Sequence, residues 1–460
     1  MKFLHLADTH LGCRRYNLDE RTKDFARAWF DIVTRHAIGK RVDFLLIAGD
    51  FFNSRAVDSQ TMNHAMIGLE ALRDAGIPVV VIEGNHDKHD VVTDHSWLRS
   101  LSKWRLIKLL EPRGMEGDES QAWDDEERTG WYIDIADARI FGSHWYGMSA
   151  NHALPLLADA LKEARDPNRF NILMLHTDVE GQLGRPIPAL SVARLKELRE
   201  LIEYVALGHT HKRFELDNWA FNPGSPEWCS TDEYGEERGC YLVEVDGERQ
   251  AAVEYIQDYT QRKLQRLTFD VSGADDPEAM HESALEQIKR EARVYDENID
   301  ALQPIIEINL RGHLGFKGSL LNLNLLRDET LAHTRALHVM VKNQTVPVEY
   351  AVAAGLDENT TRFERERRII EDLVSRDNRF ASRASDIAAL IIEAKRLALA
   401  QEAPEKIVDL IAARLDAETT DEMMLNAVMN LVAADEVTTD GAHEAATDDV
   451  HPLISHLLTV

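Results

Sequence analysis

Five short runs of large apolar residues divide the first half of the chain, and polar residues follow each run directly. The runs are rich in Val, Ile, Leu and Phe and lack strict alternation of polar and apolar positions. Such runs are typical of strands that are buried on both faces. We therefore expect an α/β fold whose buried strands cover residues 3–7, 44–48, 79–82, 172–175 and 204–207.

The pattern of apolar residues changes near Gln261, where short stretches of alternating apolar and polar residues begin. Apolar residues alternate with polar ones at residues 267–271, 306–310 and 337–341, and a helical pattern covers residues 278–292. Alternation over a few residues predicts half-buried strands. This part of the chain is therefore expected to form a small α+β module, for which a purely structural role remains an alternative.

A helical pattern dominates the C-terminal part of the chain. From Asn359, apolar residues recur at helical spacing in successive stripes, which suit either a self-contained bundle or a surface for a partner. Residues 433–450 are acidic and almost free of large apolar side chains, which predicts disorder, and a short apolar patch at 453–458 follows them. The expected segments are the main domain at 1–262, the α+β module at 263–350, the helical region at 358–433 and the acidic tail at 434–460.

Carboxylate, amide and imidazole side chains follow each of the five expected strands. In open α/β sheets, ligands bind beyond the carboxyl ends of the strands, so these side chains should meet at one site. One such block alone is usually a surface feature or a satisfied core residue, but five in succession can bind two divalent metals. A metal pair of this kind indicates phosphoester hydrolysis. The residues are Asp8, His10, Asp50, Asn85, His86, Asp87, His176, His209 and His211.

These blocks resemble those of the calcineurin-like metallophosphoesterase superfamily. Further stretches are similar to its SbcD-type DNA repair nucleases, which are relatives of the meiotic recombination double-strand-break nuclease. The resemblance implies a metallophosphoesterase β-sandwich flanked by helices, a capping domain, and C-terminal helices that pack on an SMC-like coiled-coil ATPase. The stretches that carry it are residues 3–12, 49–55, 205–211, 222–227 and 239–243.

The resemblance also implies which residues bind each metal. Mixed oxygen and imidazole ligation suits manganese, iron or zinc better than calcium or magnesium, and the family favours manganese. We therefore expect two divalent metal ions, with manganese preferred. The implied ligands are Asp8, His10 and His211 for one metal, Asn85, His176 and His209 for the other, and Asp50 as the bridge.

Proton transfer to the leaving sugar oxygen falls to His86 in this family, with Asp87 expected to orient its ring. Asn53 departs from the family, where a histidine or an aspartate commonly stands. An amide binds phosphate or water but does not act as an acid near neutral pH. Asn53 and Arg55 are candidate DNA contacts, and a solvated loop arginine is an equally good interpretation of Arg55.

The net charge of −28 opposes unaided binding to DNA. Many acidic residues lie at 116–127 and after Arg414, where no Lys or Arg follows, so we expect a partner to supply positive surface. The family resemblance implies a homodimer that binds DNA and the ATPase. No apolar run approaches the ~20 residues of a membrane span, and the three cysteines lack metal-ligand spacing. A cytoplasmic protein with reduced thiols is therefore expected.

The combined prediction is a manganese-dependent DNA nuclease subunit, exonuclease or endonuclease, that processes DNA ends in double-strand-break repair. One alternative is a metallophosphoesterase that acts on small phosphodiesters or nucleotides. The modules beyond Gln261 argue against it, because such an enzyme needs neither of them. The other alternative is a DNA-end tether with weak catalysis, against which the complete set of metal ligands argues.

Overall fold

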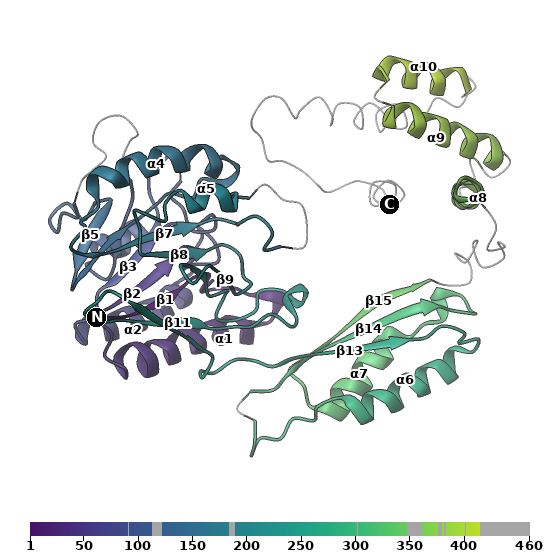
Figure 1. Ribbon diagram of the computed structural model, residues 1–460. Helices are drawn as coiled ribbons and strands as arrows, with labels where there is room; N and C mark the ends of the chain where they lie inside the picture. The colour runs from purple at the N-terminus through teal and green to yellow at the C-terminus, as the bar shows by residue number, and fades with distance from the viewer. Residues whose placement is uncertain are drawn as a thin grey trace. The chain divides into compact units, whose positions relative to one another are not determined.

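Two six-stranded sheets form the main domain of the protein in the computed structural model (Figure 1). The acidic tail expected at 434–460 and the end of the helical region lie outside the residues that the structure describes. Those residues are 1–90, 92–112, 122–183, 189–300, 302–346, 361–375, 380, 383–400 and 402–414.

The first sheet contains three of the strands predicted from buried apolar runs. In spatial order its strands are β12 (Ala251–Ile256), β11 (Cys240–Val245), β1 (Lys2–Leu6), β2 (Phe44–Ala48), β3 (Val79–Ile82) and β4 (Lys108–Leu109). Strands β1 to β4 run parallel, β11 is antiparallel to β1, and β12 is antiparallel to β11. All residues of β2 and β3 are buried, as their unbroken apolar sequences predicted.

The second sheet contains the other two predicted strands. In spatial order its strands are β5 (Tyr132–Ile135), β6 (Ala138–Phe141), β7 (Phe170–His176), β8 (Tyr204–Gly208), β10 (Ala220–Asn222) and β9 (Phe214–Leu216). The four central strands are parallel, and the two edge strands are antiparallel to their neighbours. Strands β7 and β8 therefore end at the same edge, which lets their C-terminal residues meet.

An apolar core fills the space between the two sheets. It includes Phe3 and Phe44 from the first sheet, whose rings stack 4.9 Å apart, and Ile172, Tyr204 and Phe221 from the second. Each sheet also has an apolar cluster on its outer face, where it packs against its covering helices. The expected β-sandwich flanked by helices is thereby confirmed.

Helices cover the outer faces of the two sheets, and particular residues set where one of them begins and how closely it packs. Asp58 caps one of them by accepting a hydrogen bond from the backbone amide of Thr61 at 2.7 Å. Gly68 lets this helix approach Trp29, because a Cβ at Gly68 would lie 2.2 Å from the indole nitrogen. The helices are α1 (Asp19–Asp31), η2 (Ile32–Ile38), α2 (Ser59–Asp74), α3 (Trp97–Lys103), α4 (Ala150–Ala164) and α5 (Val192–Lys196), with short turns η1 (Arg15–Asn17), η3 (Gly147–Ser149) and η4 (Thr231–Glu233).

A separate three-stranded sheet follows the sandwich in the sequence. Strands β13 (Leu264–Asp270) and β14 (Ile305–His313) are parallel, and β15 (His338–Val346) lies on the other side of β14. Helices α6 (Pro277–Glu291) and α7 (Leu323–Thr334) cover one face of this sheet (Figure 1). The strands and the helix predicted from alternating and helical patterns are confirmed, and a short turn, η5 (Gly318–Leu320), precedes α7.

Three helices form a compact group near the end of the described chain. They are α8 (Arg362–Ser375), α9 (Ala384–Leu399) and α10 (Pro404–Arg414). Apolar side chains of α8 and α9 pack together, Ile370 and Val374 against Ile387 and Ala388. Among the described residues, no helix is both long and apolar enough to cross a membrane.

Candidate metal centre

The predicted metal ligands meet where strands β1, β2, β3, β7 and β8 end at one edge of the sandwich. Two groups of three side chains that share Asp50 each bring one possible ligand atom per residue within 4.8 Å of one another. One group is His10, Asp50 and His86, and the other is Asp50, His176 and His209. Asp50 belongs to both groups and thus lies between them.

The first half of the centre lies around two facing imidazoles. The Nε2 atoms of His10 and His211 are 2.9 Å apart, and His10 Nε2 is 3.8 Å from Asp50 Oδ2. Asp8 Oδ1 approaches His211 Nε2 at 4.0 Å. Two ring nitrogens at this separation share either a proton or a cation, and the two adjacent carboxylates favour a cation.

The second half lies around His176. Its Nε2 atom is 3.2 Å from Asp50 Oδ2, 3.2 Å from Asn85 Oδ1 and 3.3 Å from His209 Nδ1. The same oxygen of Asp50 therefore faces imidazoles of both halves. Imidazole, carboxylate and amide donors of this kind fit divalent metal ions.

Strained backbone positions hold several ligands in place. In the left-handed region, a residue other than glycine costs roughly 1–3 kcal/mol and persists only where the surrounding structure fixes it. Gly49 lets the backbone lie close to a ligand ring, because a Cβ at this position would lie 2.2 Å from His176 Nδ1. The ligands with positive φ are Asp8 (52°), His10 (42°), Asp50 (50°) and His209 (88°).

Hydrogen bonds outside the centre fix the rings of two ligands. His176 donates from Nδ1 to the backbone carbonyl of Ala48 at 2.8 Å, and His211 Nδ1 lies 2.9 Å from Glu233 Oε1. Such outer bonds fix the tautomer and leave the other ring nitrogen to face a metal. Glu233 was not predicted, because it lies in the isolated turn η4, with no pattern that links it to the metal ligands.

A second carboxylate supports His209. Its Nε2 atom lies 3.2 Å from Asp178 Oδ2, and the other Asp178 oxygen accepts a hydrogen bond from Thr210 at 2.7 Å. Asp178 was also missed, although a signal was present, because it follows His176 by two residues just past a strand end. Both unpredicted carboxylates act on the ligands rather than on the metal positions themselves.

Mutual interactions explain how charged groups remain in this buried centre. Burial alone would lower the pKa of His176, but the Asp50 carboxylate raises it to about 9. Burial would raise the pKa of Asp50, yet His176 holds it well below its usual range. Burial and the neighbouring His211 lower the pKa of His10, which favours the neutral form that binds metals.

His86 lies at the exposed rim, where the sequence placed proton transfer. Its ring is 4.9 Å from that of His10, and its Nδ1 atom lies 2.8 Å from the backbone carbonyl of Asn53. The expectation that Asp87 orients this ring is wrong. The buried Asp87 carboxylate instead accepts hydrogen bonds from the amides of Phe51, Phe52 and Gly84. Burial and Asp50 raise the pKa of Asp87 to about 7.

The two candidate DNA contacts lie on the loop after β2. Asn53 is half-buried and holds His86 through its backbone carbonyl, which any residue would provide. Arg55 is exposed, and the carboxylate it lies near is that of Asp90. The backbone of Asn53 thus positions His86, and the side chains of Asn53 and Arg55 stay candidate DNA contacts.

A cysteine joins the first half of the centre. Its sulfur and the ligand nitrogens of His10 and His211 all lie within 4.8 Å of one another. This residue, Cys229, also shares a hydrogen bond with the buried thiol of Cys13. The spacing of the cysteines fits no metal motif, but folding brings Cys229 close to histidines that are distant in sequence. All three cysteines are free thiols.

The chain is similar in sequence to a phosphoesterase family and to several DNA repair proteins. Residues 1–213 match the calcineurin-like phosphoesterase family. The chain is 27% identical over 339 residues to the DNA double-strand break repair protein Mre11 of Sulfolobus acidocaldarius, which covers 71% of this chain and 80% of that protein. It is 33% identical over 234 residues to the Mre11 protein of Archaeoglobus fulgidus, over 49% of this chain and 50% of that protein. The Mre11 protein of Sulfurisphaera tokodaii is 28% identical over 320 residues, or 68% of this chain and 73% of that protein.

Proposed function

We propose that this chain, whose residues 1–213 match the calcineurin-like phosphoesterase family, is a two-metal DNA nuclease that acts in double-strand break repair. The observation that carries the proposal is the position of Asp50, whose Oδ2 faces His10 at 3.8 Å and His176 at 3.2 Å. A carboxylate oxygen between two sets of donors suits a bridged metal pair. The names of the relatives favour DNA as the substrate.

The two halves of the centre would hold one metal each. When bound, the pair neutralises charge on the phosphate and activates the attacking water. Manganese is the proposed ion, because it accepts the mixed oxygen and nitrogen donors of this site. The side chains in these roles are Asp8, His10 and His211 for one ion, Asn85, His176 and His209 for the other, and Asp50 between them.

His86 is the proposed proton donor to the leaving oxygen. A carbonyl oxygen only accepts hydrogen bonds, so the contact with Asn53 places a proton on Nδ1 and turns Nε2 away from it. In the protonated ring, Nε2 can give its proton to the sugar oxygen as the bond to phosphorus breaks. Asp87 contributes indirectly, because its carboxylate ties Gly84 to Phe51 and thus fixes the loop that carries His86.

The helices after the three-stranded sheet are the proposed docking surface for an SMC-like coiled-coil ATPase. Phe363 is 59% exposed, Ile369 43% and Leu399 76%, so α8 and α9 present large apolar side chains that their own packing leaves uncovered. Exposed apolar patches of this kind mark interaction surfaces. With the chain's charge of −28, such a partner would also supply cations for DNA. We further propose a cytoplasmic homodimer.

One experiment tests the nuclease proposal. The purified chain is incubated with linear duplex DNA and, separately, with a chromogenic phosphodiester, in manganese, with and without the ATPase. Cleavage of both substrates, with a stronger effect of the ATPase on DNA, is the expected result. Cleavage of the small ester alone under every condition would show a phosphodiesterase for small substrates instead.

A further inference from the structure

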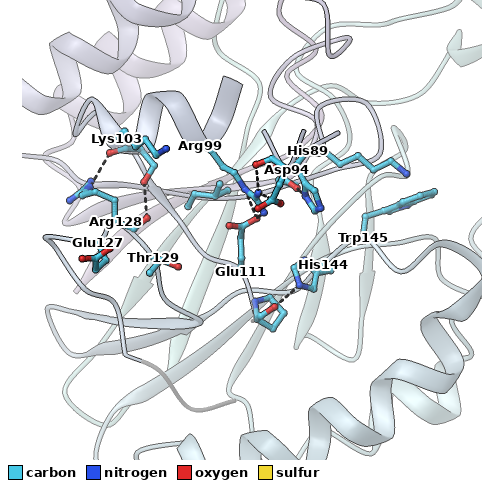
Figure 2. A pocket seen from close by; sticks show the side chains of 15 residues that line it. His89, Asp94, Arg99, Lys103, Glu111, Glu127, Arg128, Thr129, His144 and Trp145 are labelled. Atoms are coloured by element: carbon cyan, nitrogen blue, oxygen red, sulfur yellow. Dashed lines mark hydrogen bonds and ion pairs between the residues drawn. The ribbon is translucent and has the colours of Figure 1, made fainter. Parts of the chain in front are cut away.

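A large polar pocket lies beside the metal centre. Its volume is 790 Å³, and its walls come from the loop after β3, from α3, from the segment around β4 and from the segment after β6. The pocket is elongated, with different side chains at its two ends. Figure 2 shows His89 and Trp145 toward one end, Lys103 and Arg128 at the other, and Arg99 with Glu111 between them.

The pocket and the metal centre share a single loop. Residues 83–89 follow β3, and their middle part carries Asn85 and His86, whereas Lys88 and His89 line the pocket. Consecutive Cα atoms are about 3.8 Å apart, so the Cα atoms of Asn85 and Lys88 lie at most roughly 11 Å from each other. A strand bound at the centre would thus have a neighbouring nucleotide in reach of the pocket.

The opposite wall also borders the centre. His144 and Trp145 follow β6, which pairs in parallel with β7 along the register Phe141 to Leu173. Strand β7 ends at the metal ligand His176. One wall of the pocket therefore continues into the loop that carries Asn85, and the other follows a strand that pairs with β7, which ends at His176.

Three acidic side chains of the pocket bond to other residues that line it or lie beside it. Glu83 bonds to the His89 ring at 2.6 Å and to Ser96 at 2.7 Å, and Glu111 bonds to Arg99 at 2.8 Å. Asp94 pairs with the same arginine. Each of these three carboxylates therefore has a hydrogen-bonding partner within the pocket, and Asp94 and Glu111 share the single guanidinium of Arg99.

Two lysines remain available at opposite ends. Neither Lys88 nor Lys103 forms an ion pair within the described part of the chain. Among the described carboxylates that line the pocket, Glu127 is the one that also forms no ion pair. The Lys88 ammonium lies 4.3 Å from the centre of the Trp145 ring system. In a chain with 80 acidic and 52 basic residues, lysines left without acidic partners beside a phosphoesterase centre fit an anionic ligand.

Lysine and tryptophan together provide both contacts that a nucleotide needs. An aromatic ring stacks on a base of any sequence, and an adjacent cation binds the phosphate. His89, Arg99 and His144 add polar groups for base edges. We propose that this pocket binds one unpaired nucleotide of the substrate strand next to the cleaved phosphate, with its base on Trp145 and its phosphate at Lys88.

This inference rests on the proposed nuclease function, and the test separates the two. An oligonucleotide with one 2-aminopurine is titrated with the protein in calcium, and its fluorescence is followed. Stacking on Trp145 should quench the probe in the unaltered chain. In Trp145→Ala, the quench should disappear and the dissociation constant should rise about tenfold, whereas Trp145→Phe should restore most of the binding.

Two control variants show whether the loss of any exposed tryptophan or lysine would weaken binding in the same way. Trp104 is half exposed at the end of α3 and lies outside the pocket, and Lys162 is an exposed lysine of α4. Trp104→Ala and Lys162→Ala should bind as the unaltered chain does. Lys88→Ala should weaken binding about tenfold without removing the quench, and it decides the question if Trp145→Ala fails to fold.

Three outcomes are distinguishable. Unchanged quench and affinity in both Trp145→Ala and Lys88→Ala would overturn the pocket, whatever the protein cleaves. Binding of free 2-aminopurine nucleoside monophosphate, with no effect of the variants on oligonucleotides, would also overturn it and assign the pocket to a free nucleotide. The expected pattern in a protein that cleaves only the small ester would support the pocket and contradict the nuclease proposal.

Discussion

The interior of the sandwich and its metal-binding edge handle buried histidines in opposite ways. His5 lies within β1, fully buried, with its ring nitrogens 3.0 Å from the Tyr204 hydroxyl and 3.1 Å from the Leu207 carbonyl. Burial lowers the pKa of His5 to about 3, so this ring stays neutral. His10, five residues further along the same segment, is equally buried but faces His211 and Asp50.

The difference teaches what distinguishes a ligand from a core histidine. Burial is common to both, so it does not identify a site. His5 has both nitrogens bonded to groups of the protein, whereas the ligands His10 and His176 each point one nitrogen at other possible ligands. A convergence of donors that do not satisfy one another, rather than burial, marks the metal centre.

Removal of the shared carboxylate should have the largest effect. Asp50→Asn keeps the size of the side chain but removes the charge that faces both halves of the centre. We expect loss of bound metal and of phosphodiester hydrolysis to background, because both ions lose a ligand. Metal analysis of the dialysed protein and hydrolysis of a chromogenic diester measure this. Retention of two metals per chain would contradict the bridging position.

His86→Ala should separate metal binding from turnover. The side chain lies at the exposed rim and contributes a proton rather than a required ligand, so the metal content should stay unchanged while turnover falls about 10²–10⁴-fold. His152→Ala, an exposed histidine on α4, is the matched control. An emptied centre in His86→Ala would show that the ring is a ligand.

Metal affinity should rise with pH up to about 9. His176 carries a pKa raised to about 9 by Asp50, so below that pH the ring holds a proton that a metal must displace. Displacement of one proton strengthens binding by about tenfold per pH unit, and the dependence should level off above the pKa. Calorimetric titration with manganese at several pH values measures the slope. A flat profile between pH 7 and 9 would contradict this protonation of His176.

Loss of an outer carboxylate should have an intermediate effect. Glu233→Gln removes the charged partner of the His211 ring, and such changes typically weaken metal binding about 10–100-fold. Glu237→Gln, an exposed neighbour that pairs with Arg213, is the control. Competition with a metal-binding dye gives the affinity. Equal affinities in the two variants would show that Glu233 does not act through His211.

The sequence predicted much of the architecture for identifiable reasons. Unbroken apolar runs such as 44–48 and 79–82 can only be strands covered on both faces, and the polar residues after them must then share an edge. The three-stranded sheet was predictable from alternation alone. These features depend on local pattern, which the sequence carries directly.

What the sequence did not predict depends on contacts between distant segments. Glu233 and Cys229 reach the centre from a turn more than two hundred residues after His10, and neither stands in a recognisable motif. Asp87 was assigned to its neighbour His86, but its carboxylate turns inward to three backbone amides. Adjacency in sequence places side chains near each other without fixing where they point.

The smallest effect on the centre should come from the core histidine. His5→Leu fills the same space but leaves the Tyr204 hydroxyl without its partner, so the free energy of unfolding should fall by about 1–3 kcal/mol. Because both His5 nitrogens are bonded within the sandwich, metal content and turnover should remain unchanged. Chemical denaturation and metal analysis measure the two properties on the same sample. Loss of metal from a folded His5→Leu protein would show that the interior and the edge are coupled, and that contact partners alone do not separate a core histidine from a ligand.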